Sequence, residues 1–288
     1  MAPHPEPFFL DLAPGPLGRR YALYHAPAAG LATGMVVHVH PFAEEMNKAR
    51  RMTAMQSRAL AQAGFAVLQI DLLGCGDSAG DFGDATWAQW VVDVVHACEW
   101  LQTRQRDELP GGRATPPLWL WGVRAGCLIA AEAAARLRSS CNFLFWQPSV
   151  SGAPLLSQFL RMRVAGDLIG GAAKGVMAQL RHELSGGHGV EVAGYLLSPA
   201  MSSGLERAAL RPPAGAATSS VRVEWFEVSP LEGATLSPAA TQAATHWREA
   251  GFSIRTHLVR GSAFWQTTEI KDAPELLTAT LAALTSKP

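Results

Sequence analysis

The feature that most constrains the fold of this chain is the short segment Gly122-Val123-Arg124-Ala125-Gly126. It follows an apolar run at residues 118–121 that is typical of a buried strand. It precedes an alanine-rich run at residues 127–137 that is a strong helix former. Small residues on both sides of Arg124 allow a strand and a helix to pass closely, with the central residue in a strained conformation. The segment therefore predicts a sharp strand-to-helix turn within an α/β fold.

Strand-like and helix-like stretches alternate along most of the chain, which indicates a largely parallel α/β sheet. The expected strands are residues 8–12, 20–25, 34–40, 65–71, 118–121, 142–146, 221–228 and 253–259. The first two are expected to form an antiparallel ribbon. The expected helices of this part are residues 46–63, 87–105, 127–137, 239–250 and 273–286.

Residues 151–211 break the alternation. Helices are expected there at residues 153–164, 172–183 and 199–210, with an extra strand at residues 191–197. This segment is too long for a simple crossover between strands. We therefore interpret residues 151–211 as a cap inserted over the sheet, and residues 1–150 and 212–288 as the core domain.

Composition narrows the class of protein. The chain has 288 residues, 48% of them hydrophobic and 17% charged, which suits one large domain or a domain with a lid. A formal net charge of zero gives no reason to expect nucleic acid or an anionic membrane as a partner. The four cysteines lack the spacing of a metal site, and we expect neither a metal nor a cofactor.

The opening residues carry neither the basic leader nor the apolar core of a signal peptide. No stretch reaches the roughly 20 apolar residues that span a bilayer. A cytoplasmic location without a membrane span is the expectation.

Four segments occur in an order that resembles the α/β-hydrolase superfamily: residues 40–48 (HPFAEEMNK), 71–78 (DLLGCGDS), 122–126 (GVRAG) and 261–265 (GSAFW). More closely, they resemble the group called exosortase A system-associated hydrolase 2, found beside bacterial exopolysaccharide and protein-sorting genes. The resemblance implies a three-layer αβα fold, with a mostly parallel sheet of about eight strands and a helical cap. It also implies a hydrolase that acts on ester bonds.

The resemblance shows which catalytic positions have changed. In the superfamily, a serine occupies the centre of the G-x-S-x-G turn and a histidine follows the last strand. Here Arg124 holds the serine position and Ala263 the histidine position. Glu227 and Glu232 are the nearest candidates for the acid, and neither has the usual context. Because a Ser-His-Asp set works as a unit, the usual acyl-enzyme route is not expected.

The resemblance also places an oxyanion hole at backbone amides. The N–H of Phe42 or Ala43 would be one donor and the N–H of Ala125 the second. These donors do not depend on the serine, so a polarising pocket can remain. The alternative is a simple turn that closes a buried strand. Trp265, in the turn that normally carries the histidine, is a candidate pocket wall.

A guanidinium at the centre of this turn lies beside the N-terminus of the next helix, where an anion is favoured. Glu44 or Glu45 on the facing loop is a candidate internal partner for Arg124. An external carboxylate or phosphate ligand is the alternative. If Arg124 is buried, it requires one of these two anionic partners, because an unpaired buried charge is costly.

Two functions remain open from the sequence. In the first, His40 with Glu44 or Glu45 forms an acid–base group and Arg124 anchors an anion. The chain would then be a non-standard hydrolase or acyl-transfer enzyme on an ester, thioester or acylated saccharide. In the second, it is a degenerate hydrolase that binds an acyl or anionic small molecule, a second copy of itself or another protein. The side-chain neighbours of Arg124 distinguish the two.

Overall fold

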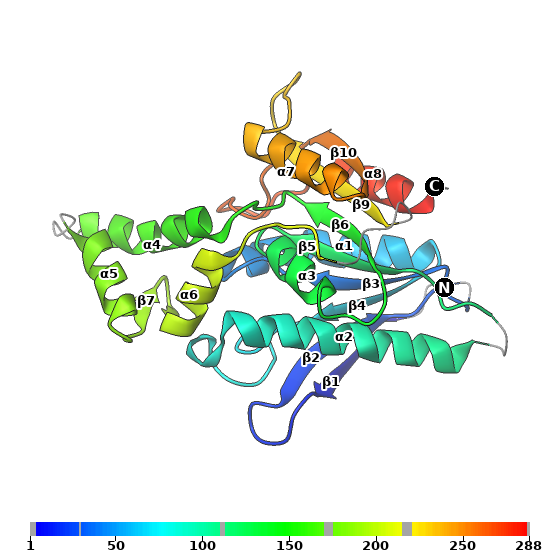
Figure 1. Ribbon diagram of the computed structural model, residues 1–288, viewed down its shortest axis with the longest axis horizontal. Coiled ribbons are helices and arrows are strands. Elements are labelled where there is room, and N and C mark those ends of the chain that lie inside the picture. The colour runs from blue at the N-terminus through cyan, green and yellow to red at the C-terminus, as the bar shows by residue number, and fades with distance from the viewer. Residues whose placement is uncertain (1–3, 29, 110–112, 170–174, 215–220, 287–288) are drawn as a thin grey trace.

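A computed structural model describes the chain at residues 4–28, 30–109, 113–169, 175–214 and 221–286. The strands of the main sheet are β1 (Glu6–Asp11), β2 (Arg19–His25), β3 (Gly34–Val39), β4 (Phe65–Ile70), β5 (Leu118–Val123), β6 (Asn142–Trp146), β9 (Arg222–Ser229) and β10 (Ser253–Arg260). Their order is β1-β2-β4-β3-β5-β6-β9-β10 (Figure 1). β1 and β2 form an antiparallel pair, β2 is antiparallel to β4, and all later neighbours are parallel. The expected mostly parallel sheet with a leading antiparallel ribbon is confirmed.

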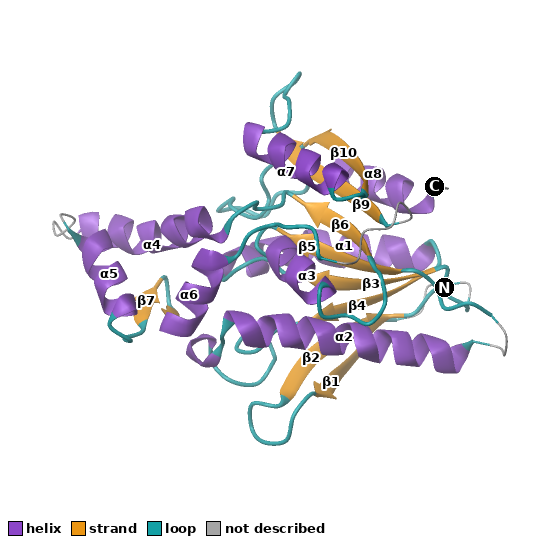
Figure 2. Ribbon diagram, in the orientation of Figure 1, coloured by secondary structure: helices purple, strands orange, loops and turns teal. Residues whose placement is uncertain are grey.

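Helices cover both faces of the sheet and complete three layers (Figure 2). One face is covered by α1 (Glu44–Gln62) and α8 (Pro274–Thr285). The other is covered by α2 (Trp87–Glu108), α3 (Gly126–Ala134) and α7 (Pro238–Glu249). The central strands β3 and β5 are buried along their whole length, as parallel strands between two helical layers require.

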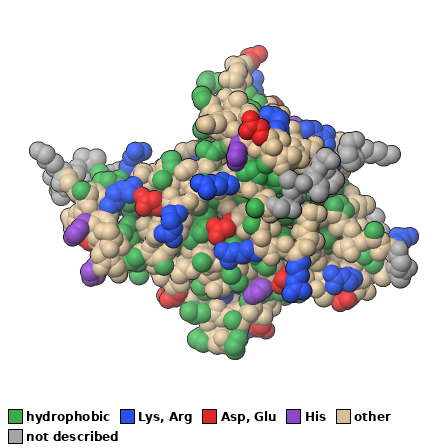
Figure 3. Space-filling model, viewed as in Figure 1, with side chains coloured by type: hydrophobic (Ala, Val, Ile, Leu, Met, Phe, Trp, Pro, Cys, Tyr) green, Lys and Arg blue, Asp and Glu red, His purple; other side chains and the backbone are tan. Residues whose placement is uncertain are grey.

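Side chains of β3 alternate between the two cores. Met35 and Val37 belong to the core on the α2 side, and Val36 belongs to the core on the α1 side. On the face seen in Figure 3, basic and acidic side chains are interspersed, in keeping with the net charge of zero. No helix in the described ranges is long and apolar enough to cross a membrane.

The chain between β6 and β9 projects from one end of the sheet (Figure 1). This projection contains α4 (Gly152–Ile169), α5 (Val176–Ser185), β7 (Val190–Val192), β8 (Tyr195–Leu197) and α6 (Pro199–Arg207). Ser198 Oγ donates to the carbonyl oxygen of Ala85 at 2.9 Å. A methyl group at Gly204 would lie 2.2 Å from Cβ of Trp87, so α6 packs directly on α2. The domain division at residues 151–211 stays a prediction.

The single strand expected at residues 191–197 is wrong. β7 and β8 are antiparallel, and Val192 pairs with Tyr195. Between them, Ala193 and Gly194 have φ values of 51° and 83°. Two consecutive residues with positive φ form the tight turn of a hairpin, and alanine at the first position does not signal it.

Two expected helices of the projection differ at their ends. The helix expected at residues 172–183 is present as α5, and its residues 172–174 lie outside the described part of the chain. The helix expected to reach residue 210 ends at Arg207, because Ala208 has an extended conformation with ψ of 136°.

The close approach of α3 to β3 is testable by substitution. A methyl group on Gly126 would lie 2.2 Å from the carbonyl oxygen of Val39 and 2.7 Å from that of His40. Because backbone atoms must move to accept it, we expect Gly126→Ala to lower the free energy of unfolding by about 2–4 kcal/mol. Ala88→Gly, at an exposed position of α2, is a control expected to cost about 1 kcal/mol. Urea unfolding followed by circular dichroism measures both, and a smaller loss for Gly126→Ala than for the control would contradict the close approach.

Candidate functional site

The turn between β5 and α3 has the sharp geometry expected from the sequence. Arg124 has a φ of 54°, in the left-handed region that residues other than glycine rarely occupy. Its amide donates to the carbonyl oxygen of Trp146 at 3.0 Å. Its carbonyl oxygen accepts from the amides of Cys127 and Ser149 at 3.2 and 3.3 Å. These bonds hold a conformation that costs of the order of 1–3 kcal/mol.

The side chain of Arg124 forms an ion pair with a glutamate of the same chain. Its Nε donates to Oε1 of Glu45 at 3.3 Å, and the two side chains are 13% and 9% exposed. The guanidinium carbon lies 5.6 Å from the ring centroid of Trp265, within range of a cation–π contact. Of the two partners that the sequence left open, the structure contains the internal one.

Burial dominates the protonation of Glu45. It raises the pKa of the Glu45 carboxyl to about 7, although the attraction of Arg124 lowers it, and the Glu44 carboxyl raises it further. The pKa of Glu44 is raised too, chiefly by burial. Near neutral pH the Glu45 carboxyl is therefore divided between its protonated and ionised forms.

Three buried polar atoms beside the ion pair have no hydrogen-bond partner among the described residues. They are Oε2 of Glu44, Oε2 of Glu45 and Nε1 of Trp265. A cavity of about 60 Å³ adjoins the two carboxyls, and α4 covers it. Its lining residues are Phe42, Glu44, Glu45, Leu155, Gln158, Phe159 and Met162. From the sequence, the apolar face of the helix at residues 155–163 was open to two interpretations, a cover for a hydrophobic ligand or packing on the sheet.

Ala43 and Ala125 bring backbone amides to the two sides of this region. Ala43 has a φ of 49° and immediately precedes α1, and Ala125 immediately precedes α3. Within the described residues, neither amide nitrogen has a hydrogen-bond acceptor. Free amides at helix N-termini are donors suited to an anion. An oxyanion role for Ala43 and Ala125 stays a prediction. The ring centroid of Phe42 lies 5.1 Å from that of Phe159 in α4.

His40 is engaged by the backbone on both ring nitrogens. Nδ1 lies 2.8 Å from the carbonyl oxygen of Pro41, and Nε2 accepts from the amide of Leu72 at 3.2 Å. Nδ1 is therefore the protonated nitrogen of a neutral ring. Burial lowers the pKa of His40, which favours that neutral form. His40 lines a different small cavity from Glu44 and Glu45, and no hydrogen bond joins it to either glutamate among the described residues, so the acid–base role of the three stays a prediction.

The candidate acids Glu227 and Glu232, and the histidines His246 and His257 in or near the last strand, are either bonded to other residues or exposed. Glu227 accepts from the amide and the hydroxyl of Ser237 at 3.2 and 3.4 Å, at the start of α7. Nε2 of His257 lies 2.7 Å from Oε2 of Glu224. Glu232 and His246 are exposed. No hydrogen bond or ion pair joins any of them to Arg124 in the described part of the chain.

Residues 31–185, more than half of the chain, match the hydrolase family described as serine aminopeptidase, S33. The chain belongs to this family. Its sheet order and three layers are those of the α/β-hydrolase fold, so the expected fold class is confirmed. In this S33-family chain, among the described residues, no group of three or more His, Cys, Asp or Glu side chains is arranged to hold a metal ion.

Solved structures share the fold of this S33-family chain over nearly its whole length. A carboxyl esterase from Bacillus coagulans is 14% identical, with 99% of this chain and 98% of that chain covered and a TM-score of 0.60. Est1E from Butyrivibrio proteoclasticus is 12% identical, with 92% and 94% covered and a TM-score of 0.60. Monoglyceride lipase from Saccharomyces cerevisiae is 11% identical, with 99% and 96% covered and a TM-score of 0.58. No curated protein matches the chain by sequence, and these low identities establish the fold alone.

The raised pKa of Glu45 predicts a pH-dependent stability. Its pKa is about 7 in the folded chain against 4.5 as the ordinary value, so the folded state retains a proton that the unfolded state has lost between these pH values. The free energy of unfolding therefore falls as pH rises through this window, by up to about 3 kcal/mol from this group. Glu45→Gln cannot ionise and lacks this loss. The difference in the free energy of unfolding between variant and wild type should therefore shift in favour of the variant as pH rises from 5 to 8.

Urea unfolding of both proteins at pH 5 and pH 8 measures this difference. Glu249→Gln, which removes an exposed carboxylate on α7, is the control and should follow the wild type. An identical pH dependence for the wild type and Glu45→Gln would contradict the raised pKa.

Proposed function

We propose that this S33-family chain is a binding protein that keeps the α/β-hydrolase fold without acyl-enzyme chemistry. The ion pair between Arg124 and Glu45 carries the proposal, because it fills the nucleophile position with a closed and largely buried contact. Ala263 at the histidine position supports it. A nucleophile and its base act as one unit, so the loss of both removes the covalent route instead of slowing it.

The ligand of such a site would not meet a free guanidinium. Glu45 holds Arg124, and removing one partner of a buried ion pair costs about 3–5 kcal/mol. Glu44 and Glu45 line the cavity together with Gln158 and apolar side chains of α4, and Oε2 of each carboxyl is buried without a hydrogen-bond partner among the described residues. We therefore propose a small ligand with an apolar part and a hydrogen-bond donor, in place of the anion that an open Arg124 would select.

The absence of acyl-enzyme chemistry is directly testable. We expect no covalent labelling by a fluorophosphonate probe, because no activated serine occupies the turn. Short- and medium-chain p-nitrophenyl esters and acyl thioesters should react at the buffer rate with the wild type, Arg124→Ala and Glu44→Gln. A serine esterase serves as the positive control. Labelling of the wild type, or turnover above the buffer rate, would contradict this function.

One observation favours a second function, hydrolysis without a covalent intermediate. Glu45 combines a pKa of about 7 with an unpartnered oxygen near the cavity, as a general base for water requires. The amides of Ala43 and Ala125 would stabilise the oxyanion, and Arg124 would hold Glu45 in place. His40 would position the loop through its two backbone bonds.

The substrate of that second function would be an ester, a thioester or an acylated saccharide. The resemblance of residues 40–48, 71–78, 122–126 and 261–265 to the exosortase-associated hydrolase group supports the acylated saccharide. The same resemblance supports a role beside polysaccharide export, and the cytoplasmic location stays a prediction from the sequence.

The second function makes a specific pH prediction. Turnover should rise with pH through about 7 as Glu45 ionises, and Glu45→Gln should lose it by about 100-fold or more. Because Glu44 raises the pKa of Glu45, Glu44→Gln should move the midpoint of the pH–rate profile to lower pH. Steady-state rates on an acylated saccharide between pH 5 and 9 measure both effects. An unmoved midpoint in Glu44→Gln, or full activity in Glu45→Gln, would exclude Glu45 as the base.

A further inference from the structure

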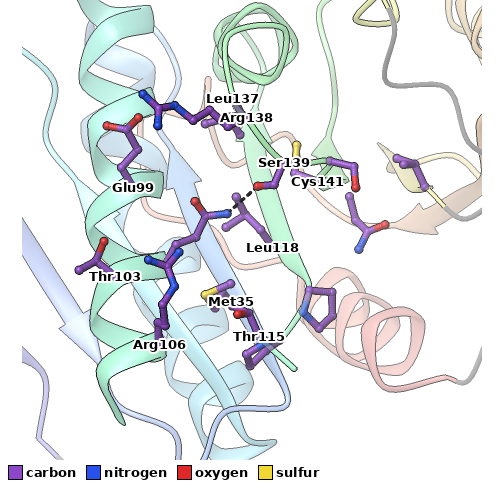
Figure 4. A pocket seen from close by; sticks show the side chains of 16 residues that line it. Met35, Glu99, Thr103, Arg106, Thr115, Leu118, Leu137, Arg138, Ser139 and Cys141 are labelled. Carbon is purple, nitrogen blue, oxygen red and sulfur yellow. Dashed lines mark hydrogen bonds between the residues drawn. The ribbon is translucent and has the colours of Figure 1, made fainter. Parts of the chain in front are cut away.

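A groove lies at the opposite end of the parallel strands from Arg124. Its volume is about 760 Å³, within the range of small-molecule sites. Met35 and Leu118, at the starts of β3 and β5, lie in its floor, whereas Arg124 follows the end of β5 (Figure 4). The two regions are therefore separated by the length of the sheet.

One wall of this groove is a single face of α2. Glu99, Gln102, Thr103 and Arg106 line it, and their spacing of three, one and three residues places them on the same side of a helix. The facing wall is the segment that follows α3, which carries Arg138 and Ser139 (Figure 4). Nε2 of Gln102 donates to Oγ of Ser139 at 2.9 Å and joins the two walls.

The two arginines of the groove, Arg106 and Arg138, differ from neighbouring arginines in having no acidic partner among the described residues. Arg104 and Arg136, two residues earlier in the chain and outside the groove, are ion-paired to glutamates at 3.0 and 2.9 Å. The guanidinium groups of Arg106 and Arg138 have no ion pair or hydrogen bond within the described residues. Glu99 offsets one of their charges, so two arginines and one glutamate leave a formal charge of +1 on the groove.

The remaining lining defines the rest of the ligand. Hydroxyl and amide groups of Gln102, Thr103 and Ser140 suit a ligand with several hydroxyls, and the floor is apolar and buried at Met35 and Leu118. A guanidinium binds a carboxylate or a phosphate through two parallel hydrogen bonds. We propose that this groove is a binding site for an acidic sugar, held by Arg106 and Arg138 through its carboxylate or phosphate.

This site does not depend on the function proposed for the region around Arg124. Isothermal titration calorimetry at low salt, with glucuronate and glucose 6-phosphate as probes, tests it and distinguishes the two anionic groups. We expect at least one probe to bind, and unsubstituted glucose to bind at least roughly tenfold more weakly. The Arg106→Ala/Arg138→Ala double variant should lose roughly tenfold or more in affinity for that probe. Affinity should fall at higher salt, because both guanidinium groups are exposed.

The matched control is Arg136→Ala/Arg248→Ala, which removes the same charge from exposed positions outside the groove. It should bind the probe as the wild type does, and so should Glu45→Gln. Thermal unfolding confirms that each variant is folded before titration. No heat with either probe at about 10 mM, equal affinity for glucose, or unchanged affinity in the Arg106→Ala/Arg138→Ala variant would overturn the proposal.

Discussion

Gly126 lies against the backbone at the end of β3, and the geometry of the site depends on that contact. A methyl group there would lie 2.2 Å from the carbonyl oxygen of Val39, so only glycine allows α3 to begin at this depth. The approach brings the amide of Ala125 beside the loop that leads into α1. The chain reverses direction between β5 and α3 at Arg124, which has a φ of 54°. One backbone contact thereby sets both the direction of the Arg124 side chain and its access to Glu45.

The ion pair that results is governed more by burial than by attraction. An exposed pair of this kind contributes about 0–1 kcal/mol and leaves the carboxyl fully ionised at neutral pH. Here burial raises the pKa of Glu45 to about 7 in spite of the neighbouring guanidinium. The second oxygen of Glu45 is also buried, and it has no hydrogen-bond partner in the part of the chain that the structure describes. The site thus couples a largely buried ion pair to a carboxyl that can hold or release a proton near neutral pH.

A fold is a weaker guide to chemistry than the groups that it positions. This chain shares its architecture with esterases and a lipase at 11–14% identity, yet we propose that arginine and alanine hold its nucleophile and base positions. The two hollows also differ in character. The cavity under α4 presents carboxyls and apolar groups, whereas the groove at the opposite end of the strands presents unpaired guanidinium groups and hydroxyls. We therefore assign anion recognition to Arg106 and Arg138 and not to Arg124.

Local residue patterns determined the strands and helices of the sheet and the sharp turn at Arg124, because periodicity and small flanking residues act over short distances. They did not reveal the hairpin at Ala193, whose positive φ is no property of alanine. Nor could they choose between Glu44 and Glu45, which are adjacent in sequence and 79 or more residues from Arg124. Only the folded chain brings Glu45 to Arg124, places α4 beside Glu45, and turns both nitrogens of His40 toward the backbone. The pKa of Glu45 likewise belongs to the tertiary structure, because removal of water from a carboxyl requires the surrounding protein.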